Sequence, residues 1–389
     1  MKSKFEEIKE IEDQYQLNTY KKLPISIERG EGVYVYDTNH KKYLDLYGGH
    51  AVAIVGHSHP HIVKAITEQV NKLIFYSNVV YLEIRAKASE AIINVAPTEI
   101  NKVFFCNSGA EANETALKIA RRFTGKQTVI AMKNSFHGRT IGALSATSLG
   151  NYRNQFAPVI DAFKFVEFGK ISAIEEVLSD DVAGIILEPI QSMAGIEIAD
   201  DQYYKALRDI CTEKGIVLIF DEVQTAFGRT GSWFFGDAIG VTPDLITCAK
   251  GIGGGIPVGA VLINEDISKT IKHGEHGSTF GGGPIASAAI LANIEIIKNE
   301  NLLSNALEIG SYITENLMGI PIVKNVKGKG LLLGIELNEE AAKVRDYLLE
   351  RGIITGTSAK KNVLRLLPPI ILKKEDLGIF FEALKEYSK

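Results

Sequence analysis

The sequence predicts an α/β protein with a large domain, built on a mainly parallel sheet covered by helices, and a small α/β domain formed from both termini. Between about residues 60 and 300, apolar β-rich runs alternate with segments of helical periodicity. These runs are continuously apolar, as expected of strands that are buried on both faces. The predicted strands cover residues 102–106, 128–132, 183–187, 216–220 and 245–248.

The two ends of the chain have a different pattern. Residues 32–36 and 42–46 predict a hairpin around turn residues 37–40. Near the C-terminus, a strand at 331–337, a helix at 341–350 and an amphipathic helix from about Lys374 predict a small α/β unit that pairs with this hairpin. A length of 389 residues fits two domains. We expect segments 1–55 and 305–389 to form the small domain and 56–304 the large one.

Composition and charge exclude several classes of protein. The chain has 46% hydrophobic and 23% charged residues and a net charge of −4, with both signs mixed along it. This surface gives little attraction to nucleic acid, and no run is long and apolar enough to span a membrane. Cys106 and Cys248 lie at predicted strand ends and Cys211 in a predicted helix, without a C-x-x-C pair. We expect buried thiols and a cytoplasmic protein.

Polar motifs follow the predicted strands at the sheet edge where ligands of α/β proteins bind. After 102–106 comes a Ser-Gly turn at Ser108 and Gly109, followed by a helix. Free N–H groups at the start of a helix, together with a hydroxyl, bind phosphate, although a simple capped loop has the same pattern. No P-loop or complete G-x-G-x-x-G motif is present, which argues against ATP or a dinucleotide.

Three further strand ends carry groups that suit a flat, basic ring. Phe136 and Arg139 follow 128–132, and an aromatic ring there can stack on a heterocycle while the arginine binds a carboxylate. Packing and surface roles are the simpler alternatives for these two residues. Asp221 and Gln224 follow 216–220, where the acid pairs with a cationic ring or, alternatively, binds Mg²⁺.

Lys250 follows the strand at 245–248 and precedes a run of glycines. A partly desolvated lysine at a strand end is a candidate Schiff-base nucleophile. Together these motifs require a phosphate, a stackable ring, a basic ring nitrogen and an aldehyde. Pyridoxal 5'-phosphate has all four, and an acid that keeps its ring nitrogen protonated lets the ring accept electrons.

In this order, the motifs resemble those of the class III pyridoxal-phosphate aminotransferases, most closely the acetylornithine and ornithine aminotransferases. The resemblance spans nearly the whole chain and implies the fold of the type I pyridoxal-phosphate enzymes. The matching segments are 107–114 (NSGAEANE), 136–140 (FHGRT), 187–191 (LEPIQ), 220–231 (FDEVQTAFGRTG), 249–251 (AKG) and 276–281 (HGSTFG).

The resemblance implies a role for each cofactor-binding residue. Lys250 forms the Schiff base and is the catalytic residue, Asp221 binds the pyridine nitrogen, and Gln224 bonds the ring oxygen. Val223 and Phe136 enclose the ring. The remaining implied cofactor residues are Ser108, Gly109 and Ala110 at the phosphate, His137 and Glu188 beside the ring, and Thr279, which reaches the phosphate of the neighbouring subunit of a homodimer.

The resemblance also implies substrate contacts. Arg139 resembles the arginine that binds the α-carboxylate of acetylornithine, and Arg365 the one that binds a carboxylate of the amino-acid or keto-acid partner. Asn78 and Ser278 are assigned to the substrate side as well. Two arginines suit 2-oxoglutarate, which has two carboxylates.

The implied activity is transfer of the ω-amino group of N-acetylornithine, or a close analogue, to 2-oxoglutarate by a ping-pong mechanism, a reaction of arginine biosynthesis. Ornithine, succinylornithine and 4-aminobutyrate aminotransferases are alternatives. A semialdehyde aminomutase of the same fold would need no keto acid, and a non-catalytic binding protein would be colourless.

Two positions depart from the family pattern. Met193 stands where many relatives have a glutamate, which in ornithine aminotransferases pairs with the C-terminal arginine. Arg365 is therefore expected to stay available to carboxylates, which argues against an ornithine δ-aminotransferase. Gly283 replaces a common asparagine, and nothing in the sequence explains it. The alternating histidines 57, 59 and 61 resemble a metal site, but no cysteine or carboxylate cluster accompanies them, and we expect no metal.

Overall fold

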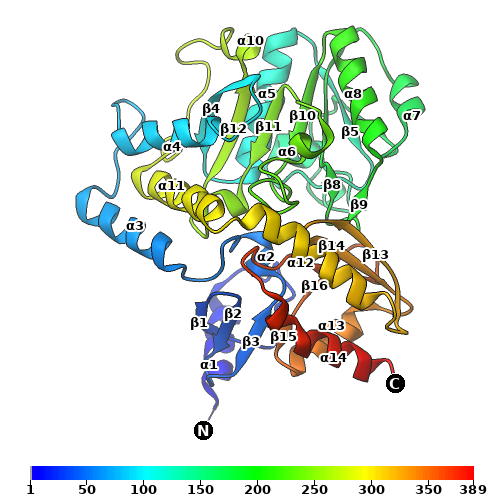
Figure 1. Ribbon diagram of the computed structural model, residues 1–389. Coiled ribbons are helices and arrows are strands. Elements are labelled where there is room, and N and C mark those ends of the chain that lie inside the picture. The colour runs from blue at the N-terminus through cyan, green and yellow to red at the C-terminus, as the bar shows by residue number, and fades with distance from the viewer. Residues whose placement is uncertain (1) are drawn as a thin grey trace.

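A seven-stranded sheet lies at the centre of the upper part of the molecule in Figure 1. The computed structural model describes residues 2–389. Strand β12 runs antiparallel to both of its neighbours, whereas the other pairs are parallel, so the predicted mainly parallel sheet is confirmed. In spatial order the strands are β4 (Ile100–Cys106), β12 (Gly259–Asn264), β11 (Leu245–Cys248), β10 (Val217–Asp221), β7 (Val182–Leu187), β5 (Thr128–Met132) and β6 (Phe163–Val166).

Helices cover both faces of this sheet because its strands are apolar on both sides. Val217 and Ile219 of β10 pack in one cluster with α5 (Gly109–Thr124). Leu218 and Phe220, which point to the other face, pack with α8 (Asp201–Lys214). The predicted strand runs therefore form a buried layer, and the loops at their carboxyl ends are left to build a site.

Further helices lie around the sheet and along the junction between the upper and lower parts. Helices α11 and α12 run between the two parts of the molecule (Figure 1). The bounds are α3 (Pro60–Lys72), α4 (Glu83–Ile93), α6 (Ile141–Ser145), α7 (Ile171–Glu175), α9 (Phe235–Ile239), α10 (Glu265–Ser268), α11 (Pro284–Asn299) and α12 (Leu302–Leu317).

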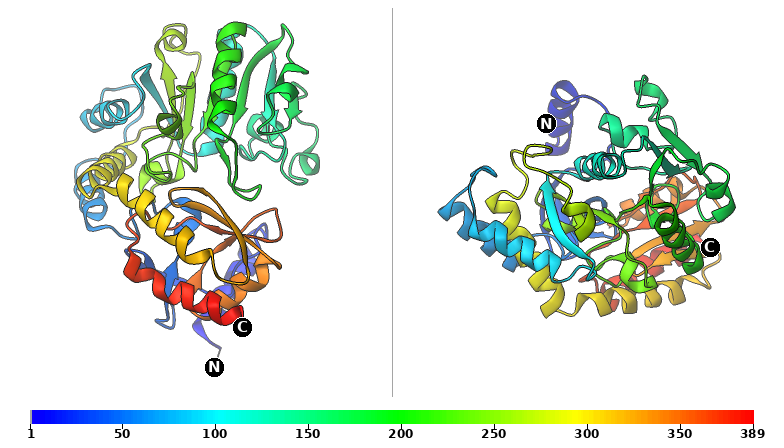
Figure 2. Two further views of the ribbon diagram at one scale, coloured as in Figure 1. Left: turned by 45° about the vertical axis from the view of Figure 1, so that its right-hand side comes forward. Right: turned by 90° about the horizontal axis from the view of Figure 1, so that it is seen from above.

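Both termini contribute to the lower part, as Figure 2 shows by the blue and red ribbons lying together. The predicted hairpin is present, and a C-terminal strand joins it in parallel to β3, which confirms the predicted pairing of the two ends. One sheet contains β1 (Ile27–Glu31), β2 (Tyr34–Asp37), β3 (Lys42–Asp45) and β15 (Ile353–Ile354), and the other β13 (Val323–Lys329), β14 (Leu332–Leu337), β17 (Val363–Leu366) and β16 (Gly356–Thr357). Helices α1 (Lys4–Tyr15), α13 (Ala341–Glu350) and α14 (Gly378–Tyr387) complete this part.

A left-handed turn, α2 (Gly48–Ala51), leads from the hairpin toward the upper part. Its φ angles include 56° at Gly48, 68° at His50 and 65° at Ala51. Such values are costly for residues other than glycine and persist only when the surroundings impose them. The Asp45 carboxylate accepts the backbone N–H groups of Tyr47, Gly48 and Gly49, and so holds this turn in place.

A short hairpin, β8 (Ile190–Gln191) with β9 (Glu197–Ile198), connects the upper part to the lower sheet. The Met193 carbonyl accepts the Ala359 N–H at 2.9 Å. The Glu197 carboxylate binds the Lys327 and Lys360 amines. The hairpin therefore holds the loop at 192–196 against the lower sheet, which contains Arg365 on β17.

The three cysteines are buried and free, as predicted. No helix within residues 2–389 is both long enough and apolar enough to cross a lipid bilayer.

Candidate active site

A cavity of about 460 Å³ opens at the carboxyl ends of the parallel strands. Most of the residues predicted for the site line it, although they come from loops far apart in the chain. These residues are Ser108, Gly109, Ala110, Phe136, His137, Arg139, Glu188, Asp221, Val223, Gln224 and Lys250.

The start of α5 forms an anion-binding end of this cavity. Ser108 is the N-cap, and its hydroxyl oxygen accepts the Glu111 N–H at 3.2 Å. The first N–H groups of a helix have no partner within the helix and carry its positive dipole end. A Cβ at Gly109 would lie 2.9 Å from a Val223 methyl group, so only glycine fits between this turn and the loop after β10. This geometry matches the predicted phosphate site.

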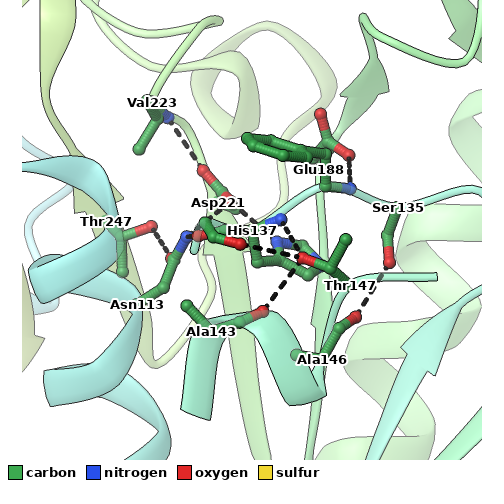
Figure 3. Close-up of polar contacts among 12 residues, drawn as sticks. Asn113, Ser135, His137, Ala143, Ala146, Thr147, Glu188, Asp221, Val223 and Thr247 are labelled. Atoms are coloured by element: carbon green, nitrogen blue, oxygen red, sulfur yellow. Dashed lines mark hydrogen bonds and ion pairs between the residues drawn. The ribbon is translucent and has the colours of Figure 1, made fainter. Parts of the chain in front are cut away.

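Asp221 lies at the end of β10 with its carboxylate held from behind. Its Oδ2 accepts the Asn113 Nδ2–H at 2.7 Å and lies 2.7 Å from His137 Nδ1 (Figure 3). Its Oδ1 accepts only the longer 3.2 Å bond from the Val223 N–H. Donors on one oxygen stabilise the carboxylate, and the other oxygen retains capacity for a cationic partner in the cavity.

Phe136 and Glu188 are coupled at the neighbouring strand ends. The Phe136 backbone N–H donates to Glu188 Oε1 at 2.8 Å, so the acid fixes the backbone that carries the aromatic ring. Burial raises the pKa of Glu188, whereas His137 lowers it. A buried carboxyl with a raised pKa can carry a proton near neutral pH, which is useful beside a reacting centre.

Lys250 follows β11 in a short helical turn and has a positive φ of 47°. Burial lowers the pKa of its amine, while Asp221 and Glu188 raise it. Lys250 has no ion-pair partner within 4 Å among residues 2–389. A buried amine of lowered pKa spends more time uncharged, which is the state that attacks a carbonyl or accepts a proton.

Gln224 provides an independent sign that the cavity receives a polar ligand. Its side-chain Oε1 is buried and has no hydrogen-bond partner. An unsatisfied buried polar atom is costly, so it implies a partner supplied by a ligand or water. Gln224 lines the same cavity as Val223 and Phe136, so a ligand bound there can supply this partner.

The two predicted substrate arginines occupy different surroundings. Arg139 is exposed at the cavity lining, with its guanidinium 4.4 Å from the centre of the Tyr152 ring. Arg365 on β17 is only 2% exposed and does not line the cavity wall itself. It still contributes to lowering the pKa of Lys250, after the larger effect of burial.

Arg365 is held by neutral groups. Its Nε donates to the Thr357 carbonyl at 2.7 Å, Nη1 to Ser192 Oγ at 3.0 Å and Nη2 to Tyr47 Oη at 2.6 Å. No carboxylate of residues 2–389 pairs with it. Burial lowers the pKa of Arg365, but a guanidinium keeps its charge in proteins. The predicted availability of Arg365 to a carboxylate is consistent with this arrangement.

Besides Arg365, three predicted residues do not line the cavity of their own chain. Asn78 Nδ2 donates to the Ser278 carbonyl at 2.9 Å, and both residues line a second hollow of about 370 Å³. Ser278 Oγ accepts the Asn107 Nδ2–H at 3.3 Å, and Asn107 lines the main cavity, so the two hollows adjoin. Thr279 is exposed and therefore free to contact another chain.

The alternating histidines bind separate carboxylates. His57 lies 2.8 Å from Asp45, His59 3.1 Å from Glu300, and His61 2.6 Å from Glu295. Within residues 2–389, no group of three or more potential ligands could hold a metal ion.

Several contributing residues were not predicted from the sequence. Asn113 supports Asp221, whereas Tyr47 and Ser192 hold Arg365. Asn113 had a detectable signal, because a polar residue at the buried face of α5, among Ala112 and Ala116, needs a specific partner. Tyr47 and Ser192 had no such signal.

The residues present fit pyridoxal phosphate. The helix start provides phosphate donors, the narrow contact at Gly109 brings them close, and Gln224 has an unsatisfied oxygen. Asp221 suits a protonated ring nitrogen, and Lys250 suits an aldehyde. When bound, this cofactor supplies an electron-accepting ring, a capacity that no side chain of the cavity has.

Comparisons with known proteins agree with this chemistry. A family model described as aminotransferase class-III matches residues 15–387. The acetylornithine aminotransferase of Methanosarcina mazei is 44% identical over 378 residues, which cover 96% of this chain and 94% of that protein. Ornithine aminotransferase 1 of Staphylococcus aureus is 40% identical, with 98% of each chain covered.

Solved structures show the same similarity. An ornithine aminotransferase of Toxoplasma gondii, crystallized in the presence of oxidized glutathione and with partial occupancy of PLP at its active site, superimposes with a TM-score of 0.92. It is 29% identical, and the match covers 100% of this chain and 95% of that one. The chain thus belongs to the class III aminotransferases, with pyridoxal phosphate as its cofactor.

Proposed function

We propose that this aminotransferase moves the ω-amino group of N-acetylornithine, or of a close analogue, to 2-oxoglutarate, giving the semialdehyde and glutamate. Similar proteins named acetylornithine aminotransferase support the donor. The observation that carries the proposal is the set of neutral partners around Arg365.

Arg365 determines which charges the site accepts. With three N–H groups engaged, the guanidinium retains one free N–H on each terminal nitrogen, which suits a bidentate carboxylate. The same uncompensated positive charge repels a second free amine on the donor. Acylation removes that charge from the α-amine, so N-acetylornithine is a better match than ornithine.

The side chains of the cavity divide the chemistry between them. Lys250 would hold the cofactor through its amine and, once the donor has displaced it, would accept the proton of the donor carbon. Asp221 keeps the ring nitrogen protonated, and Glu188 holds the Phe136 backbone. Arg139 and Arg365 bind the carboxylates of the substrates. The donor and the acceptor occupy the site one after the other.

A donor panel under single-turnover conditions tests the proposal. The loaded enzyme is mixed with each donor, without keto acid, and the absorbance change of the bound cofactor is followed. We expect N-acetylornithine to react faster than 4-aminobutyrate and ornithine. A faster reaction with 4-aminobutyrate would remove the acetylornithine assignment. A faster reaction with ornithine would support an ornithine aminotransferase, the activity named for the Staphylococcus aureus relative.

We also propose a homodimer with shared active sites. Large apolar side chains are exposed on the segment before α4, with Val79 83% and Tyr81 104% exposed, and Phe280 nearby is 63% exposed. Patches of this kind are characteristic of interfaces. Thr279 is exposed next to Phe280, which supports the proposed contact with the phosphate of a second copy. Val79→Glu should produce monomers with weakened cofactor binding in sedimentation and absorbance measurements, and an unchanged dimer would contradict this interface.

The sheet shared by the two ends of the chain supports the proposed domain boundaries. We assign residues 1–55 and 305–389 to the small domain and 56–304 to the large one, because β15 pairs with β3 across the two ends of the chain. Limited proteolysis that cleaves first near residues 55 and 305 would support the assignment.

A further inference from the structure

The two carboxylate oxygens of Asp221 have different hydrogen-bond partners. Oδ2 is 2.7 Å from both His137 Nδ1 and Asn113 Nδ2, whereas Oδ1 has only the longer bond from the Val223 N–H. The carboxylate is therefore fixed through one oxygen, and its orientation toward the cavity depends on the groups behind it. Figure 3 shows these groups on the side of Asp221 away from Val223.

The Asn113 side chain uses both its amide nitrogen and its amide oxygen in hydrogen bonds. Its Nδ2 donates to Asp221 Oδ2 and also to the His137 carbonyl, at 2.7 Å each. Its Oδ1 accepts the Thr247 hydroxyl at 2.7 Å. The reversed amide would place its oxygen against a carboxylate and a carbonyl, which is repulsive, so Asp221 and the His137 carbonyl determine the orientation of the amide, while the Thr247 hydroxyl anchors its oxygen.

The positions of these residues connect the two ends of the cofactor site. Asn113 lies on α5, whose first residues form the phosphate-binding turn. Thr247 lies on β11, directly beside Asp221 of β10 in the sheet register. Asn113 is 1% exposed and Thr247 is fully buried, so neither bond competes with water.

We propose that Asn113, anchored by Thr247, is a positioning residue that aims Oδ1 of Asp221 at the ring nitrogen of the cofactor. The assignment rests on the cofactor and is independent of the amino donor. It predicts that changes at Asn113 or Thr247 weaken recognition of the ring nitrogen specifically, while recognition of the phosphate and aldehyde is kept.

Cofactor affinity measured on the apoprotein, without substrate, tests this role. The dissociation constants of pyridoxal phosphate and of its 1-deaza analogue, which lacks the ring nitrogen, are compared by fluorescence titration. For Asn113→Leu we expect the preference for pyridoxal phosphate over the analogue to fall by about tenfold, as loss of a hydrogen bond to a charged group implies. Affinity for the analogue should change little.

Variants at Thr247 keep the test decisive if Asn113→Leu does not fold. Thr247→Val, which is close in shape, should reduce the same preference, and Thr247→Ser, which keeps the hydroxyl, should retain it. Thr230→Val is the matched control, because this buried hydroxyl donates to the Thr225 carbonyl and does not contact Asp221. The proposal would be overturned if Thr247→Val and the control had the same preference for pyridoxal phosphate over the analogue. It would also be overturned if Thr247→Val lost affinity for both compounds equally, because that result indicates a purely structural role.

Discussion

Replacement of Arg365 by lysine should impair the keto-acid half-reaction more than the donor half-reaction. Arg365 has three hydrogen bonds to neutral groups, and two of its five N–H groups have no partner among residues 2–389. Lysine keeps the charge but not the planar fork, so one charge-assisted hydrogen bond is lost. At about 1.5–3 kcal/mol for such a bond, kcat/KM for 2-oxoglutarate should fall by roughly 10- to 150-fold.

The assay follows each half-reaction by stopped-flow absorbance of the bound cofactor. The aminated enzyme is mixed with 2-oxoglutarate, and separately the loaded enzyme is mixed with N-acetylornithine, whose carboxylate is assigned to Arg139. Arg351→Lys is the matched control, since Arg351 belongs to the same part of the molecule but is partly exposed and packs on Tyr347. An Arg365→Lys enzyme that folds, binds cofactor and reacts with 2-oxoglutarate as fast as the control would refute the assignment.

Three further outcomes are expected. Lys250→Ala should abolish turnover in steady-state assays while retaining the fold, because it removes the only group assigned to both cofactor attachment and proton transfer. Tyr47→Phe removes one acceptor of Arg365 and should raise KM for 2-oxoglutarate by about fivefold with little change in kcat. Burial raises the pKa of Glu222 to about 8, above its ordinary value of 4.5. The folded state therefore binds this proton more tightly, so the stabilisation is complete below pH 4.5 and is lost as the pH rises through 8. Between pH 4.5 and 8, the melting temperature of Glu222→Gln should accordingly fall less steeply with pH than that of the unmodified protein. Equal falls of the melting temperature with pH would contradict this expectation.

The sequence predicted the features that depend on local pattern. Continuous apolar runs identified the strands, and the polar residues directly after them converge at one sheet edge because parallel strands end together. Asp221 and Lys250 could be predicted without knowing the distances between loops, because each comes after a predicted strand. Strands β6 and β12 were not predicted, and the antiparallel direction of β12 leaves no mark in its apolar composition.

The remaining features depend on contacts between distant segments. Asn113 and Asp221 are 108 positions apart, and Tyr47 and Arg365 are 318 apart, so no local pattern could pair them. The left-handed turn at His50 and Ala51 contradicts their local preferences and exists because Asp45 binds the backbone before it. The sequence showed that Met193 is not an acid, but only the structure shows Ser192 as a neutral partner of Arg365.

Attachment of the cofactor to one lysine is the most direct measurement of the proposed site. The purified protein is loaded with pyridoxal phosphate, reduced with borohydride, digested and mapped by mass spectrometry. We predict a single cofactor adduct on the peptide that contains Lys250. An adduct on a different lysine, or full loading without any adduct, would contradict the assigned chemistry.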